Sequence, residues 1–119
     1  MIDHVALNVL NFEKSRTFFL HVFEPLRYTI AFEEGGFCAF NVQGGLFEIW
    51  QFAGEGRVAP IHVAFRVGDK TLVDAFYEAA LANGGKDNGA PGPRDYTPNY
   101  YAAFILDPDG NNIEVMFDE

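Results

Sequence analysis

Four side chains of the kinds that bind metal ions or move protons occupy matching places in the two halves of the chain. His4 begins the run HVALNV and His62 begins the run HVAFRV, whereas Glu48 and Glu114 each lie inside an apolar run, FEIW and IEVM. Two neutral imidazoles and two carboxylates suit Zn²⁺, Ni²⁺, Mn²⁺ or Fe²⁺. Such an ion can polarise a carbonyl group while a neighbouring carboxylate transfers a proton. If the two halves pack with their sheets facing, the four side chains converge on one metal centre.

The repetition of this pattern is what favours a shared role over four separate structural ones. A single histidine at the start of a strand, or a single glutamate within one, is usually just hydrogen-bonded or exposed to solvent. Chance does not readily place all four at corresponding points of both halves. The third histidine, His21, has no counterpart, because the equivalent position is Ala79, and we expect it on the surface of a helix.

A helix is predicted shortly after the first histidine strand. Apolar residues recur at helical spacing from Phe12 to Phe23, Asn11 or Ser15 is the candidate for its cap, and Pro25 ends it. The second half repeats this arrangement, and both halves place two aromatic residues at the same distance from the histidine.

The second helix is predicted with Asp69 or Thr71 as the capping residue. Its apolar stripe includes Phe76 and Tyr77, and Gly84-Gly85 ends it. Each half is therefore expected to start with a strand and a helix.

Short apolar runs separated by glycine follow each helix and predict strands. In the first half they are residues 27–34, 36–42 and 46–52. In the second half a long loop over residues 87–99 is expected before two strands, which are joined by the turn DPDGN. Each half is thus predicted as a strand, a helix and two or three strands, which is an α+β fold in one domain. Module one spans residues 1–52, a linker spans 53–60, and module two spans 61–119.

Composition excludes several classes of function. Seventeen acidic against eight basic residues leave a formal charge of −9, which repels nucleic acid and anionic membrane surfaces. No signal peptide or membrane-spanning run is evident, and the single cysteine cannot form an internal disulfide, so we expect a cytoplasmic protein. That cysteine, Cys38, lies in the run FCAF and is expected to be a buried residue rather than a reactive thiol.

The runs HVALNV and HVAFRV, the ending DPDGNNIEV and the order of elements resemble the vicinal oxygen chelate superfamily. This group includes glyoxalase I, bleomycin-resistance proteins and extradiol dioxygenases. The resemblance covers essentially the whole chain and implies two βαβββ modules that form an open, cup-shaped mixed sheet with helices outside. It implies a divalent metal held by His4, Glu48, His62 and Glu114. It also implies Lewis-acid enolisation of a small carbonyl or oxyanion metabolite by a lyase or isomerase, with Glu114 or Glu48 transferring the proton.

The residues that would select the substrate differ from those of glyoxalase I. Asn8 and the region around Phe52 stand where that group places polar contacts to glutathione, so the glutathione adduct is not expected as the substrate. Tyr96, Tyr100 and Tyr101 are candidate pocket residues. Arg16 and Arg94 are candidate anion contacts, although a surface role is favoured for both.

Two other functions stay open. A protein similar to bleomycin-resistance proteins would sequester a planar ligand in an aromatic cleft without turnover, a hypothesis consistent with thirteen phenylalanines. An extradiol-type dioxygenase is the third hypothesis, and the acidic Glu48 disfavours it. The resemblance also implies a homodimer, with the metal ligands drawn either from one chain or from two.

Overall fold

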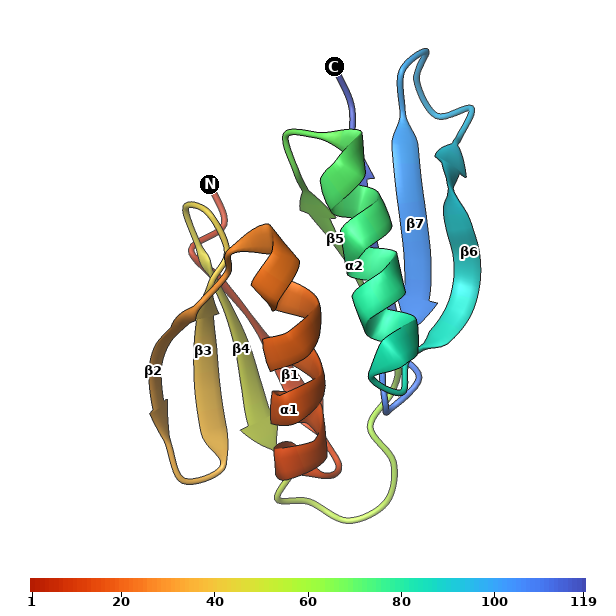
Figure 1. Ribbon diagram of the computed structural model, residues 1–119. Coiled ribbons are helices and arrows are strands. Elements are labelled where there is room, and N and C mark those ends of the chain that lie inside the picture. Colours follow the sequence, from red (N-terminus) through yellow and green to blue (C-terminus); the bar gives the residue numbers. More distant parts are fainter.

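Each half of the chain forms one βαβββ module, and together they make the α+β fold expected from the sequence (Figure 1). The computed structural model describes residues 1–119. Module one contains β1 (His4–Val9), α1 (Phe12–Phe23), the short 3₁₀ helix η1 (Glu24–Leu26), β2 (Ile30–Glu34), β3 (Phe37–Asn41) and β4 (Leu46–Gln51). Module two contains β5 (His62–Arg66), α2 (Lys70–Ala82), β6 (Lys86–Pro93), β7 (Tyr101–Leu106) and β8 (Asn112–Phe117).

The two sheets have the same topology. The strand order is β1-β4-β3-β2 in module one and β5-β8-β7-β6 in module two. In each sheet the first strand runs parallel to the last, and the remaining neighbours are antiparallel. Both sheets are therefore mixed and open, and the first and last strands, which carry the predicted metal ligands, lie side by side.

The structure shows which of the predicted residues cap each helix. Asn11 accepts a hydrogen bond from the backbone N–H of Lys14, and Asp69 accepts one from that of Thr71. Gln51, on β4, accepts a further bond from the N–H of Phe12. These bonds satisfy donors that the first helical turn leaves unpaired, which is why the helices begin where they do.

The long loop expected over residues 87–99 was wrong in its first part, because β6 occupies Lys86–Pro93. This strand pairs with β7 through an irregular register that shifts on both sides of Gly89. A proline cannot donate to a ladder and is tolerated only at a sheet edge, and β6 is an edge strand. Gly89 has φ 149°, a backbone angle that residues with a side chain rarely adopt. The Gly- and Pro-rich composition predicted a loop, whereas the open edge accommodates it as a strand.

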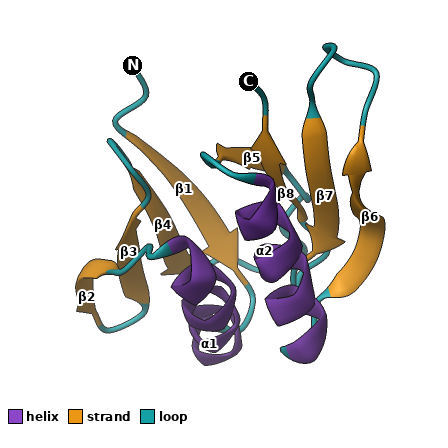
Figure 2. Ribbon diagram, turned by 45° about the horizontal axis from the view of Figure 1, so that its top comes forward, coloured by secondary structure: helices purple, strands orange, loops and turns teal.

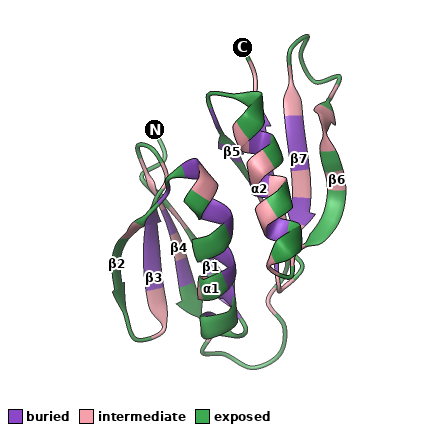
Figure 3. Cartoon of the chain, in the orientation of Figure 1, coloured by how far each residue is buried: buried purple, intermediate pink, exposed green.

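The modules meet through their helices, which lie side by side and cover one face of each sheet (Figures 1 and 2). A cluster of 22 buried residues runs through both modules (Figure 3). The ring of Phe23, from α1, lies 5.3 Å from that of Phe65, from β5, so module two contributes to the interior of module one. Neither helix is long and apolar enough to cross a membrane.

Candidate functional site

The predicted ligands lie on the face of each sheet that points away from its helix, here called the open face. Residues paired across neighbouring strands point to the same face, and side chains alternate between faces along a strand. The register pairs Glu48 with Ala6 and Ala39, and it pairs Glu114 with Ala64 and Phe104. Each histidine lies two residues before the alanine that pairs with the glutamate, so it shares the open face and lies diagonal to the glutamate.

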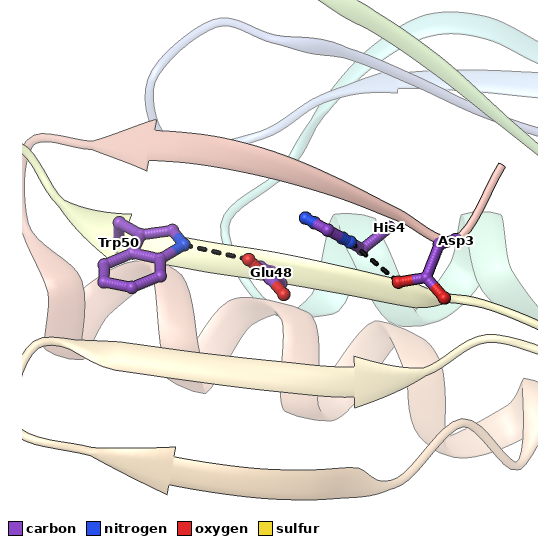
Figure 4. A network of polar contacts seen from close by, with 4 residues as sticks. All are labelled: Asp3, His4, Glu48 and Trp50. Atoms are coloured by element: carbon purple, nitrogen blue, oxygen red, sulfur yellow. Dashed lines mark hydrogen bonds and ion pairs between the residues drawn. The ribbon is translucent and has the colours of Figure 1, made fainter.

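The first half-site consists of His4 and Glu48 on the open face of module one (Figure 4). Nδ1 of His4 lies 2.8 Å from Oδ1 of Asp3, and the indole N–H of Trp50 donates to Oε1 of Glu48 at 3.1 Å. These bonds leave Nε2 of His4 and Oε2 of Glu48 without a partner in the protein. The hydrogen bond to Asp3, and then the charge of Glu48, raise the pKa of His4.

The second half-site consists of His62 and Glu114, and here the two side chains are in contact. Nε2 of His62 lies 3.1 Å from Oε1 of Glu114, and Nδ1 of His62 lies 2.9 Å from the carbonyl oxygen of Asn112. The hydroxyl of Tyr100 donates to Oε2 of Glu114 at 2.5 Å. Burial, followed by this bond, raises the pKa of Tyr100 to about 12. Glu114 is 3% exposed, so its carboxylate depends on these partners.

The second pair has the chemistry of a cation site. The carbonyl of Asn112 can only accept, so Nδ1 of His62 carries a proton. In a neutral imidazole Nε2 then presents a lone pair, which faces a carboxylate oxygen at 3.1 Å. Two acceptors at this distance require a proton or a metal cation to interact favourably. A carbonyl that fixes the second ring nitrogen is also the usual support of a metal-binding histidine.

Within one chain, the four predicted ligands form two separate pairs. No group of three or more histidine, cysteine, aspartate or glutamate side chains lies close enough together to hold a metal ion. The two modules meet through their helices. Their sheets do not face each other, as convergence of the four ligands within one chain would require.

The three predicted pocket tyrosines have different surroundings. Tyr100 contacts Glu114, and the exposed Tyr96 packs edge-on against Tyr100 with ring centroids 4.9 Å apart. Tyr101 lies on the helix-covered face, where its hydroxyl donates to Asp74 at 2.7 Å. Of the three, Tyr100 is therefore the one that touches a predicted ligand.

Other side chains considered from the sequence take structural positions. Arg16 forms a two-pronged ion pair with Glu33, and Arg94 donates to backbone carbonyls and lies over the ring of Phe104. Cys38 is fully buried, as expected, and His21 is exposed.

Sequence reasoning missed a role for Trp50 and for the partners that orient each histidine. The alternation of β4 puts Trp50 on the same face as Glu48, which was recognisable. Its hydrogen bond to Glu48 and its packing against Phe37 depend on the pairing of β3 with β4, which no local pattern specifies.

Comparison with known proteins identifies the family of the chain. The model of the Glyoxalase/Bleomycin resistance protein/Dioxygenase superfamily matches residues 1–115, so the chain belongs to this superfamily. A search of curated proteins finds no match.

Solved structures share the fold over nearly the whole chain. A glyoxalase/bleomycin resistance protein from Albidiferax ferrireducens T118 is 27% identical with a TM-score of 0.85, and 98% of each chain is covered. A glyoxalase-related enzyme from Fulvimarina pelagi is 19% identical with a TM-score of 0.79, covering 99% of this chain and 88% of that one. A lactoylglutathione lyase from Agrobacterium tumefaciens is 21% identical with a TM-score of 0.73, covering 98% and 92%.

Proposed function

We propose that the protein is a metal-dependent, glyoxalase-like lyase or isomerase that acts on a small carbonyl or oxyanion metabolite. The observation that carries this proposal is the pair of acceptor atoms, Nε2 of His62 and Oε1 of Glu114, that face each other at 3.1 Å. Membership of the superfamily supports the same conclusion.

The donor atoms of both half-sites fit a divalent metal. His4 and His62 would each supply Nε2, because Nδ1 of each ring is already hydrogen-bonded. Glu48 would supply Oε2 and Glu114 would supply Oε1. Two imidazole nitrogens and two carboxylate oxygens suit Zn²⁺, Ni²⁺, Mn²⁺ or Fe²⁺. A bound metal would supply Lewis acidity toward a substrate carbonyl.

Glu48 is the better placed of the two glutamates to transfer a proton. Its side chain is partly exposed on the open face and accepts a single hydrogen bond, from Trp50, so the carboxylate that would bind the metal could also turn toward the substrate. It would remove the proton from a hydroxyl-bearing carbon beside the carbonyl and return it to the carbonyl carbon, while the hydroxyl proton moves to the former carbonyl oxygen, so that carbonyl and hydroxyl exchange places. Glu114, buried and held by Tyr100, would keep a fixed position.

We further propose that the complete centre forms across a homodimer, with module one of one chain facing module two of its partner. Each chain carries both half-sites, and they do not meet within it. A twofold dimer would join them into two equivalent centres.

Metal analysis tests the proposal directly. The purified protein, dialysed against each candidate ion, is expected to retain one divalent metal per chain by elemental analysis. The variants His4→Ala and His62→Ala are each expected to lose it, whereas His21→Ala, on the outside of α1, retains it. A wild-type protein that retained no metal, and whose melting temperature did not change with added metal, would overturn the proposal.

Mixing two variants that each lose the metal tests the composite centre. His4→Ala and His62→Ala chains, unfolded and refolded together, form heterodimers in which one centre has all four ligands. The mixture is therefore expected to regain about a quarter of the wild-type metal content. The matched control mixes His4→Ala with Glu48→Ala, which damage the same module and cannot complement each other. A metal content that stayed at zero in both mixtures would contradict the composite centre.

One observation favours a second candidate, a ligand-binding protein without turnover. Large aromatic side chains are exposed beside Glu48, among them Trp50. A protein that binds ligand but retains no metal would establish this second function.

A further inference from the structure

An aromatic hollow lies next to the first half-site, on the open face of module one. It has a volume of about 670 Å³ and includes Phe32, Phe37, Trp50, Glu34 and Glu48 in its lining. The ring centroid of Phe37 lies 4.2 Å from that of Trp50 and 5.4 Å from that of Phe32. Trp50 is 44% exposed and Phe32 is 53% exposed, so a large part of each side chain is open to solvent.

The position of the hollow follows from the register of three strands. Glu34 pairs with Phe37, which pairs with Trp50, and all three therefore share the open face. Beside them, Ala39 separates Phe32 from Glu48. The small alanine leaves space between the aromatic rings and the carboxylate.

The charge of the lining is entirely negative. Glu33, the third acid of the lining, is neutralised by Arg16, whereas Glu34 and Glu48 form no salt bridge. No lysine or arginine lines the hollow. The N–H of Trp50 is taken up by Glu48, so the ring face is the part of the indole left for a ligand.

We propose that this hollow binds a flat aromatic group that carries a positive charge. The faces of Phe and Trp rings attract both stacked rings and cations, and in the metal-free protein the carboxylates of Glu34 and Glu48 add to the attraction for a cation. An anionic ring would be repelled by Glu34 and Glu48, so of the substrates proposed above the inference selects a carbonyl compound with a cationic ring rather than an oxyanion. The inference deepens the proposed function, on which it rests for the ligand's role as substrate, because a ligand seated here lies beside Glu48.

Trp50 is the chain's one tryptophan, so intrinsic fluorescence reports directly on the hollow. The experiment titrates the protein, in the presence of a chelator, with N-methylquinolinium as the planar aromatic cation. Naphthalene-2-sulfonate serves as an aromatic anion and tetramethylammonium as a cation without a ring. Calorimetry gives the dissociation constants in parallel. The aromatic cation is expected to bind with saturation, at least tenfold more tightly than either of the other two probes.

Variants locate the binding. Phe37→Leu and Phe32→Leu are each expected to weaken binding of the aromatic cation by about threefold to tenfold, which corresponds to a cation–ring attraction of about 0.5–1.5 kcal/mol. Phe32 is exposed, so its variant keeps the test valid even if Phe37→Leu is unstable. Glu34→Gln should weaken the cation and not the anion. The matched controls, Leu81→Ala and Glu78→Gln on the surface of α2, should change nothing.

Three results would overturn the inference. The first is equal affinity for all three probes, and the second is an affinity for the aromatic cation that does not change in the Phe32 and Phe37 variants. The third is that dimerisation shifts the Trp50 emission to the blue and abolishes probe binding. The third result would mean that a second copy covers the hollow. Because the titration is done without metal, failure here leaves the metal analysis untouched, and loss of metal in His62→Ala leaves the probe affinity untouched.

Discussion

The two modules share a topology but present different half-sites. In module two Glu114 is buried, touches His62 and is held by Tyr100, whereas in module one Glu48 is partly exposed and separate from His4. Duplication therefore preserved the ligand types and the register, while the surroundings of the two pairs diverged.

Equivalent positions on the two open faces show how they diverged. The residue paired with the glutamate is Ala39 in module one and Phe104 in module two. The residue two places after the glutamate is Trp50 in the first and Met116 in the second. Phe104 fills module two beside its glutamate, whereas Ala39 leaves room in module one. The second half-site thus holds its carboxylate between two partners, whereas the first leaves space beside its own.

The two modules share one packed interior, although their open faces are separate. Removing a side chain from this shared interior has the largest expected effect on stability. Phe23 is fully buried and its ring packs against those of Phe40, Phe47 and Phe65, the last from module two. Phe23→Ala should lower the free energy of unfolding by about 3–5 kcal/mol, because it removes a large buried ring and leaves a cavity. Urea denaturation measures this loss, with the surface variant Leu20→Ala as the control.

The same experiment sharpens the view that both modules unfold together. A single urea transition followed by Trp50 fluorescence and by circular dichroism is expected in both proteins, since Trp50 reports module one alone. Separate transitions by the two probes in the wild-type protein would mean that the modules are independent.

Removing one hydroxyl tests whether the second half-site is the more ordered one. Tyr100→Phe deprives the buried Glu114 of a donor and should cost about 1.5–3 kcal/mol of unfolding free energy, the range for a hydrogen bond to a charged group. Trp50→Phe deprives Glu48, and water can replace the lost donor there, so a smaller loss is expected. Thermal or urea denaturation of the metal-free proteins compares the two. Equal losses would show that the two glutamates depend on their partners to the same degree.

Much of the fold could be predicted from the sequence because the signals were local and repeated. Helical spacing, the cap candidates Asn11 and Asp69 and the glycine-bounded apolar runs each depend on a few neighbouring residues, and the repeat reinforced them. The strand β6 could not be predicted in this way, because its Gly- and Pro-rich residues are stabilised only by pairing with β7 at a sheet edge.

The candidate site was predictable in residue type but not in assembly. The positions of His62 and Glu114 in matching strands predicted a pair, and the two side chains are in contact. Whether both pairs converge depends on how the modules pack, and that packing is decided by long-range contacts such as Phe23 against Phe65. Trp50 shares a face with Glu48 through the alternation of β4, whereas its packing against Phe37 depends on the sheet register, which a one-residue shift would destroy.

The smallest effect on stability is expected at a buried position where the two modules differ by a single sulfur atom. Cys38 of β3 corresponds to Ala103 of β7, since their partners on the last strands are Ile49 and Val115, and both residues are fully buried. Cys38→Ala copies module two into module one and should cost about 1 kcal/mol, because it removes one well-packed sulfur atom.

The cost of this substitution should also depend on pH. Burial raises the pKa of the Cys38 thiol from 9.0 to about 11. A raised pKa contributes stability that is complete below pH 9 and is lost as the pH rises toward 11. The difference in unfolding free energy between the wild-type protein and Cys38→Ala should therefore shrink above pH 9, vanish near about pH 10 and then change sign, since all other groups are common to both. Urea denaturation at pH 8, 9 and 10 measures it, and thiol alkylation should require unfolding. A difference that stayed constant with pH, together with rapid alkylation of the native protein, would place the thiol in contact with water rather than in the packed interior.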